Sequence, residues 1–350
     1  MVESELTERR RQVLQAVLDD YIRTAEPVGS RVVAKRYPLG LSPATIRNTM
    51  ADLEELGYLT QPHTSAGRVP TDQAYRFYVD GLLAGGRELG PRSSPPFSSR
   101  SEVESLMAET SQHLSVSSHL TGMVLAPPLR TTILERVELL QLEGNRVLAV
   151  VVTESEWLTT KVLSVEPAIS PGELREFSRL LTDRFGGRTF ESIQQWVERA
   201  GERPEDPDPP VHQAEDLARQ VLAVVGERNL YLGGILNILD QPEFSDIQAM
   251  KDLLRTLEAK GRLVNLLTLH ADSPGVQVLI GRENPYEELQ DFSLVTSTYS
   301  AGNQVLGILG VVGPRRMPYD QIVSLVEETA TLMGQWLRGL NEAERARARV

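Results

Sequence analysis

The sequence predicts an α+β chain of several domains that begins with a small domain built mainly of helices. Its length of 350 residues is more than one domain usually needs. Helical apolar spacing fills most of residues 1–83, whereas residues 84–101 are dominated by Gly, Pro and Ser and have no apolar period. We therefore expect a linker there. Both strand patterns and helix patterns follow it, which indicates mixed α+β domains.

Two helices are expected at the start of the first domain. Thr7 to Ile22 carries apolar side chains on one helical face, and Thr7 can serve as its N-cap. A second helix is expected from Arg31 to Tyr37, and Pro38 ends it. The short turn 39–41 contains a glycine and leads into a third helix, an arrangement typical of a helix-turn-helix.

The third helix is followed by the pattern of a small β-hairpin. Ser42 is a good N-cap, Pro43 suits the first helical position, and Gly57 suits the end of the helix. Tyr58–Gln61 has the pattern of a short strand, and residues 63–68 form a polar turn with a glycine near its tip. Helix, glycine, strand and polar hairpin in this order predict the second half of a winged helix-turn-helix.

The polar face of the third helix is suited to contact DNA. Ala44 and Asn48 lie opposite the apolar face, and Thr45 and Arg47 flank them. Small residues permit close approach, and Asn and Arg can form paired hydrogen bonds to base edges. The full set of candidate DNA-binding residues is Ser42, Ala44, Thr45, Arg47, Asn48, His63, Thr64, Ser65, Arg68, Arg31, Lys35 and Arg36.

The same residues also have plainer interpretations. Winged helices can serve as protein-docking modules, and Arg47 and Asn48 could simply be solvated. Ser42 is first of all a helix cap, whereas Arg68 is a candidate for a phosphate or minor-groove contact or else an ordinary solvated charge. The bases of the second helix are either a solvated face or phosphate contacts, and His63 is the weakest candidate.

The charge of the chain is unevenly distributed. The formal net charge of −12 argues at first against a nucleic-acid partner. Between Ser30 and Tyr78, however, six Lys and Arg residues face four Asp and Glu residues, so this part is slightly basic. We therefore expect weak non-specific binding to DNA, with strong dependence on specific contacts and on dimerisation.

Beyond the linker, strand and helix patterns form three blocks. Helices are expected at 102–116, 172–185, 192–200, 214–225, 246–260 and 319–337. Strands are expected at 120–126, 137–142, 146–152, 157–165, 276–280, 293–299 and 305–312. A helical block between two groups of strands indicates an insertion inside a sensor-type α/β domain. The charged residues 341–350 are expected to fray.

No pattern indicates catalysis, a metal site or a cofactor. The chain has no cysteine, and its histidines and carboxylates lack metal or acid–base spacing, so we expect that it is not an enzyme. Gly302, Gly307, Gly310 and Gly313 match no phosphate-loop spacing and are better explained as packed strand glycines. The pair 283–284 before Pro285 indicates a turn, with a ligand-binding role as the less favoured alternative.

Neither a membrane segment nor a secretion signal is expected. No apolar run reaches the roughly 18 residues that would cross a bilayer, and the N-terminal residues are charged and helical. Together with the missing cysteines, this favours a cytoplasmic protein.

Two distant segments resemble one known family. Residues 28–80 and 280–319 are similar to the heat-inducible transcription repressor HrcA, and the similarity extends over nearly the whole chain. The quoted segments are VGSRVVAKRYPLGLSPATIRNTMADLEELGYLTQPHTSAGRVPTDQAYRFYVD and IGRENPYEELQDFSLVTSTYSAGNQVLGILGVVGPRRMPY. Because they lie about 200 residues apart, chance similarity is a poor explanation.

The resemblance implies both an architecture and a function. It implies a winged-helix domain at 1–83, a GAF-like domain at 102–168 and 231–340, and an inserted dimerisation domain at 169–230. It further implies a homodimeric repressor of chaperone operons of the groE and dnaK type that binds double-stranded DNA at an inverted repeat, CIRCE. The chaperonin GroEL would keep the repressor competent, and heat shock would lower its activity.

Two other functions remain open at the level of sequence. A GAF-like domain could bind a small molecule, which would make the chain a ligand-sensing regulator. An enzyme with a winged-helix appendage lacks any catalytic constellation. The dimer interface is expected in the inserted block, where Leu217, Val221 and Leu222 share an apolar face that could equally be internal core.

Overall fold

The computed structural model divides the chain into two compact units. Unit 1 contains Met1–Leu125 and Leu230–Arg338, and unit 2 contains Ala126–Asn229 and Gly339–Val350. The structure describes residues 6–63, 66–85, 103–126, 133–154, 158–165, 169–200, 229–244, 260–269, 275–301 and 304–347, with the single residues 220, 251 and 255. Within unit 1, a winged-helix domain, here called the head, precedes a domain built on a five-stranded sheet.

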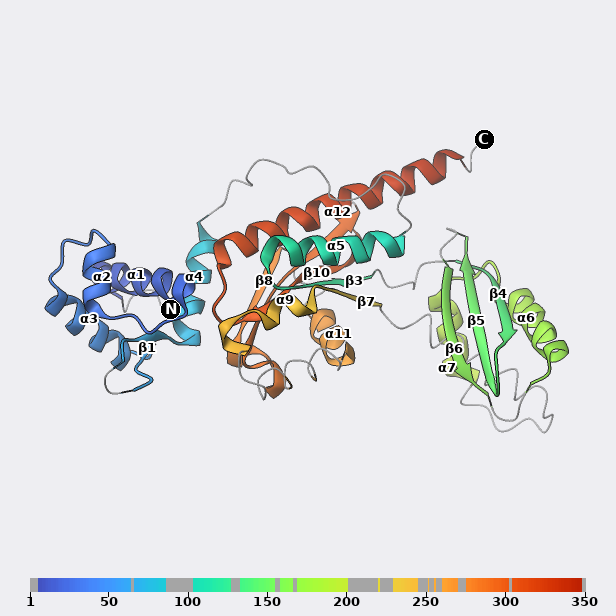
Figure 1. Cartoon of the computed structure of the whole chain (residues 1–350). Helices are drawn as coiled ribbons and strands as arrows, with labels where there is room; N and C mark the ends of the chain where they lie inside the picture. The colour runs from blue at the N-terminus through green and yellow to red at the C-terminus, as the bar shows by residue number, and fades with distance from the viewer. Residues whose placement is uncertain are drawn as a thin grey trace. The chain divides into compact units, whose positions relative to one another are not determined.

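The head has the three helices and the hairpin that the sequence predicts, followed by a fourth helix. They are α1 (Glu8–Thr24), α2 (Ser30–Arg36), α3 (Pro43–Glu55), β1 (Leu59–Thr60), β2 (Val69–Pro70) and α4 (Asp72–Ala84). Thr7 and Ser42 cap α1 and α3 by accepting the backbone N–H groups of Arg10 and Thr45. Thr71 occupies the N-cap position of α4 but makes no cap, since its hydroxyl donates to the carbonyl oxygen of Gly57 instead. Figure 1 shows the helices gathered around one short hairpin.

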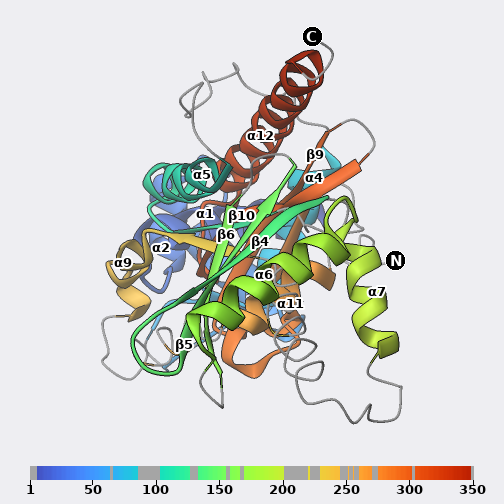
Figure 2. The same cartoon turned by 90° about the vertical axis from the view of Figure 1, so that its right-hand side faces the viewer.

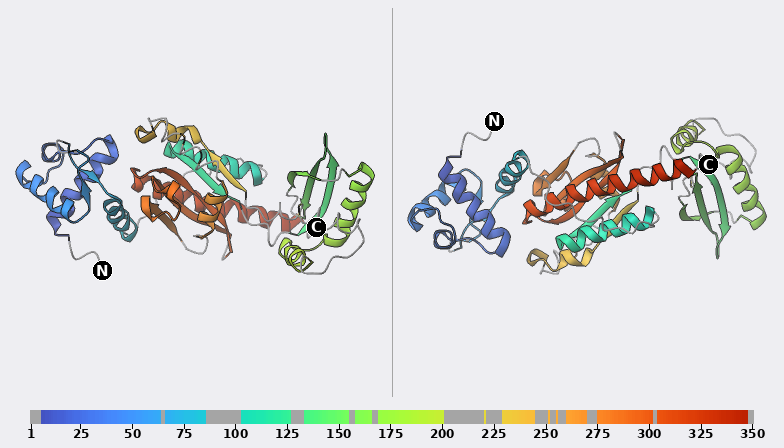
Figure 3. Two further views of the ribbon diagram at one scale, coloured as in Figure 1. Left: turned by 90° about the horizontal axis from the view of Figure 1, so that it is seen from below. Right: turned by 90° about the horizontal axis from the view of Figure 1, so that it is seen from above.

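The second domain of unit 1 is an antiparallel sheet with helices on both faces. The strands are β3 (Thr121–Leu125), β7 (Leu230–Gly233), β8 (Val276–Ile280), β9 (Phe292–Ala301) and β10 (Gln304–Pro314), in the order β7-β3-β10-β9-β8. Helices α5 (Val103–Ser118) and α12 (Tyr319–Arg347) lie side by side over one face (Figures 1 and 3). Helices α9 (Ile235–Leu239) and α11 (Lys260–Leu269) pack apolar side chains against the other face.

Glycines let the sheet and its neighbours approach closely. A Cβ on Gly310 would collide with the backbone of Val295 and Thr296 on β9, and one on Gly307 would collide with the Tyr299 hydroxyl. A Cβ on Gly313 would press on Leu120 and Met317. The prediction of packed strand glycines is therefore confirmed at these positions, while Gly302 lies outside the described residues.

Unit 2 has a separate core beneath a three-stranded antiparallel sheet. Its strands are β4 (Leu134–Gln141), β5 (Arg146–Thr153) and β6 (Leu158–Ser164), and its helices are α6 (Pro171–Phe185) and α7 (Phe190–Ala200). Ser170 and Glu173 form a reciprocal capping box that begins α6. Alternate strand residues and one face of α6 enclose the core (Figure 2). Ser178 and Thr182 of α6 also accept backbone N–H groups of β4.

The structure corrects the position of the insertion. From the sequence, the inserted domain was expected to begin at residue 169. That boundary assigned the strands within 134–164 to the same domain as β3. They form their own sheet instead, because their alternate side chains share a core with α6 and α7. Strand β3 pairs instead with β10 and β7, which lie far from it in the sequence.

Other differences concern the edges of elements. Helix α12 continues to Arg347, so the expected fraying from residue 341 does not occur up to that point. Its last residues are strong helix formers such as Glu, Ala and Arg, which explains the extension.

The sequence did not predict β7, α9 and α11, because these elements are short or lack a clear apolar period. The expected helix at 214–225, like most of that at 246–260, falls outside the described residues. In the part of the chain that the structure describes, no helix is long and apolar enough to span a bilayer.

Candidate nucleic-acid interface

Helix α3 separates an apolar face from an exposed polar face. Ile46 and Leu53 are fully buried in the head, whereas Ala44, Arg47 and Asn48 are exposed. The separation follows from the spacing of the apolar residues, which places one side of the helix on α1 and α2. The first two turns of α3 therefore present a small side chain, a guanidinium and an amide to the outside.

The hydroxyl groups at the start of α3 mainly stabilise the helix. Ser42 Oγ accepts the backbone N–H of Thr45 at 3.1 Å, and the two hydroxyl groups lie 2.9 Å apart. Thr45 is half-buried, and its carbonyl oxygen accepts the hydroxyl of Thr49. Of the polar residues in these turns, Arg47 and Asn48 are the ones most available to a duplex.

The basic residues that are candidates for DNA binding on α2 and α3 fall into two groups. Arg31, Lys35 and Arg47 are exposed, and no hydrogen bond or ion pair within the described residues engages their side chains. Arg36 instead pairs with the buried carboxylate of Asp20 at 2.6 Å, where hydrogen bonding and the carboxylate charge raise the pKa of the arginine. The predicted phosphate role therefore suits Arg31 and Lys35 better than Arg36.

The wing is attached to the body of the head. Val28, before α2, forms an isolated antiparallel bridge with Arg68, and each backbone N–H donates to the other carbonyl oxygen at 2.9 Å. The Arg68 guanidinium turns inward and pairs with Glu54, at the end of α3, at 2.8 Å. His63 is exposed beside the tip of the wing. The candidates at positions 64 and 65 lie outside the described residues.

Three carboxylates hold this interface in place, and sequence analysis missed their role. Glu54 holds the wing arginine, Asp20 holds Arg36 together with Arg23, and Asp52 pairs with Arg10 of α1 at 3.0 Å. The partner Arg10 is 42 residues from Asp52, so no local pattern reveals the pair.

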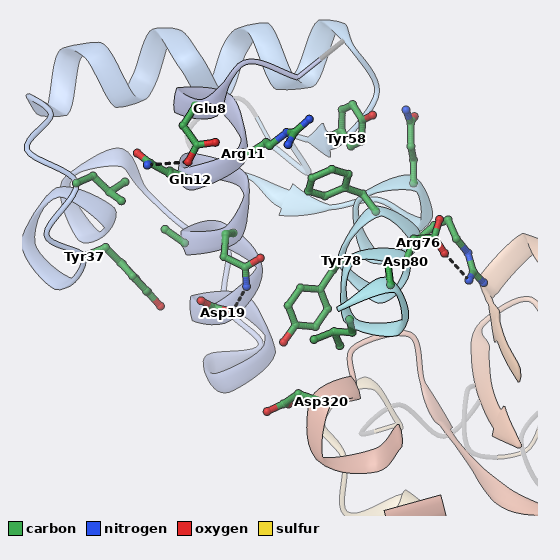
Figure 4. A pocket seen from close by; sticks show the side chains of 18 residues that line it. Glu8, Arg11, Gln12, Asp19, Tyr37, Tyr58, Arg76, Tyr78, Asp80 and Asp320 are labelled. Carbon is green, nitrogen blue, oxygen red and sulfur yellow. Dashed lines mark hydrogen bonds and ion pairs between the residues drawn. The ribbon is translucent and has the colours of Figure 1, made fainter. Parts of the chain in front are cut away.

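A large open pocket is lined mainly by the head and also by Asp320 of α12. Its volume is about 1640 Å³, and Figure 4 shows acidic, amide and aromatic side chains along α1 and α4. Burial raises the pKa of Asp19, one of the carboxylates that line the pocket. The hydrogen bond from Gln15 lowers the same pKa, but by a smaller amount. None of the candidate DNA-binding residues lines this pocket. Among the described side chains, no group of His, Asp and Glu is placed to hold a metal ion.

An exposed recognition helix, a short wing and unpaired basic residues together define a winged-helix DNA-binding protein. Residues 5–79 match the family described as "Winged helix-turn-helix transcription repressor, HrcA DNA-binding", and residues 104–323 match "HrcA protein C terminal domain". The chain therefore belongs to the HrcA family of heat-inducible transcription repressors, which are not enzymes.

The similarity to known proteins extends over nearly the whole chain. The heat-inducible transcription repressor HrcA of Geobacter sulfurreducens is 40% identical over 342 residues, covering 96% of this chain and 99% of that protein. The HrcA of Symbiobacterium thermophilum is 37% identical, with 95% and 99% covered. A crystal structure of a hypothetical protein superposes with a TM-score of 0.65 at 24% identity, covering 96% of this chain and 100% of that one, which supports the fold. The resemblance drawn from the sequence is confirmed.

Proposed function

We propose that the chain represses chaperone operons by binding the inverted repeat CIRCE as a homodimer. The observation that carries this proposal is the pair Arg47 and Asn48, which are exposed side by side on the first turns of α3 and have no partner within the described residues. An unpaired guanidinium and amide at the N-terminal end of a recognition helix can each form two hydrogen bonds to a base edge in the major groove.

Phosphate contacts would fix the orientation of this helix. Arg31 and Lys35 extend from α2, the helix that crosses the DNA backbone in a helix-turn-helix, and both are exposed. Three other bases of the head, Arg36, Arg68 and Arg76, are ion-paired to carboxylates. Few free cations remain among the described residues of the head, so non-specific affinity should be low and base contacts should dominate recognition.

We propose that unit 2 supplies the dimer contact that an inverted repeat requires. Leu140, Leu148 and Val162 are cross-strand neighbours on the face of the β4–β6 sheet that points away from α6. Leu140 is 50% exposed and Val162 is 49% exposed. An apolar row of this kind is suited to pack against its copy about a two-fold axis. The apolar face at 217–222 lies outside the described residues.

The heat response is the second part of the proposal. We propose that the protein acts in the cytoplasm, that the chaperonin GroEL maintains its active fold, and that heat releases the operator as active repressor is lost. The names of the relatives support heat control, and the small stability margin of ordinary domains makes thermal loss of activity reasonable. Operator occupancy that does not change when chaperonin is withdrawn at fixed temperature would contradict the chaperonin role.

Replacing Arg47 by alanine tests the recognition helix. The variant should bind the inverted repeat more weakly by about 1–3 kcal/mol, and discrimination at the contacted base pair should relax. Lys35→Ala is the matched control, because loss of a phosphate contact should weaken binding to all sequences alike and reduce the salt slope by about one. Fluorescence anisotropy with the repeat and with a scrambled duplex measures both quantities.

Two outcomes would count against this function. Parent protein that binds the repeat no better than the scrambled duplex would remove the operator proposal. Full specificity in Arg47→Ala, with normal folding, would remove Arg47 from the recognition surface and leave Asn48 as the remaining candidate on α3.

A further inference from the structure

Helix α4 carries two charged residues toward the sheet domain of unit 1. Asp72 accepts the backbone N–H of Arg282 at 3.1 Å and pairs with Arg315 at 3.3 Å. Arg76, one turn further along, donates Nε to the Glu283 carboxylate at 2.8 Å and Nη2 to the Val278 carbonyl oxygen at 2.6 Å. One face of α4 is therefore joined to the end of β8 and to the turn that follows it.

The receiving turn is held rigid from within. The Asn284 amide is buried and donates to the carbonyl oxygens of Gly281, Leu289 and Phe292 at 2.8, 3.1 and 3.1 Å. Glu283 accepts the backbone N–H of Ile280 at 2.8 Å as well as Arg76. The sequence indicates only a turn here. The structure shows a turn in which the Asn284 side-chain nitrogen and one Glu283 carboxylate oxygen are hydrogen-bonded within the turn itself.

A close backbone approach and a third arginine add to the contact. Gly281 has a φ of +52°, and a Cβ there would collide with the Asp72 carboxylate. Arg316 donates to the Ile22 carbonyl oxygen at 2.7 Å, in the last turn of α1, and is held by Glu243 at 2.6 Å. A cation at this end of a helix also meets the negative end of its dipole. We call Asp72, Arg76, Glu283, Arg315 and Arg316 the head–sheet latch.

We propose that Arg76 and Asp72 are positioning residues for operator binding, which hold the head on the sheet domain and thereby limit the range of separations open to the two recognition helices of a dimer. This inference rests on the proposed operator function. Neither residue is on α3 or the wing, and the Arg76 guanidinium is occupied by Glu283. Their effect on DNA binding must therefore come through the placement of the head.

A loosened head should affect two linked half-sites much more than one. Two binding modules on a rigid frame gain affinity through their high effective concentration, and that gain falls when the frame becomes flexible. Linking two modules can raise affinity by a factor of roughly 10²–10⁴. Arg76→Gln should lose part of this gain and bind the full inverted repeat at least about tenfold more weakly than the parent. Its affinity for a single half-site should stay within about twofold of the parent, as expected when no DNA contact is lost.

The experiment uses the full chain, anisotropy titrations, and repeats whose half-sites are moved apart by one or two base pairs. The parent should reject the altered spacings, whereas Arg76→Gln should accept them almost as well as the natural one. The charge exchange Arg76→Glu with Glu283→Arg should recover part of the preference. Asp80→Asn is the matched control, because Asp80 pairs with Arg76 within α4 and its loss leaves the contacts to the sheet domain in place.

Each outcome decides between the alternatives. Equal losses on the half-site and the full repeat would show that Arg76 contacts DNA or supports the fold of the head, and would overturn the inference. Unchanged affinity and unchanged spacing preference would overturn it as well. A parent protein that does not distinguish the repeat from scrambled DNA would instead reject the operator function itself.

Discussion

Phe185→Ala is expected to destabilise unit 2 by about 3–5 kcal/mol, the cost typical of removing a buried phenyl ring. Phe185 ends α6 and is 1% exposed, and its ring meets Trp196 of α7 edge-on with the centroids 5.1 Å apart. Arg184 lies 4.5 Å from the centroid of the same indole, so the substitution also loosens a cation–π contact. Differential scanning calorimetry of the full chain measures the shift in the transition of unit 2.

The matched control for this substitution is Leu180→Ala on the same helix. Leu180 is 45% exposed, so its truncation should change stability by less than about 0.5 kcal/mol. The transition of unit 1 should not move, because the two units have separate cores. If Phe185→Ala lowers both transitions equally, the units do not fold independently. If it lowers neither, α6 and α7 do not pack together through Phe185.

The same substitution connects stability to function. If unit 2 joins the two copies, Phe185→Ala should reduce the dimer population as well as the melting temperature, and affinity for the full inverted repeat should fall with it. Half-site affinity should be retained, because the head is in the other unit. Analytical ultracentrifugation at the temperature of the DNA titration separates this effect from unfolding.

Local patterns were sufficient to predict the head. Ser42, Pro43 and the spacing of Ile46 and Leu53 specify α3 and its exposed face within a few residues of sequence. For that reason the orientation of Arg47 and Asn48 could be predicted correctly. The α+β multidomain class was also correct, because alternation and helical periodicity are properties of short segments.

Contacts between distant residues were not predictable in the same way. The strand patterns at 120–126 and 137–142 look alike, yet β3 pairs with β10 while β4 pairs with β5. Ion pairs between distant residues could not be predicted either, since Arg76 is 207 residues from its partner Glu283. Without the carboxylate partners in view, Arg36 and Arg68 could be counted among the DNA contacts, although the structure uses both inside the head.

Gly67→Ala is expected to destabilise the head by about 2–4 kcal/mol, combining overpacking with weakened hydrogen bonds. A Cβ on Gly67 would lie 2.5 Å from both the carbonyl carbon and the oxygen of Val28, and 2.7 Å from the carbonyl carbon of Pro27. These neighbours are backbone, so no side chain can move aside. The wing must shift, which strains the two 2.9 Å hydrogen bonds that pair Val28 with Arg68.

This displacement should also reach the DNA-binding surface, because Arg68 joins the wing to Glu54 at the end of α3. We expect the variant to melt at a lower temperature in circular dichroism and to lose operator affinity even where it remains folded. Gly81→Ala is the matched control: nothing described lies within 4 Å of a Cβ at Gly81, in the interior of α4. There, alanine should stabilise the helix by about 0.5–1 kcal/mol. Gly67→Ala with parental stability would mean that the wing does not pack on Val28, and that Arg68 is free to contact DNA after all.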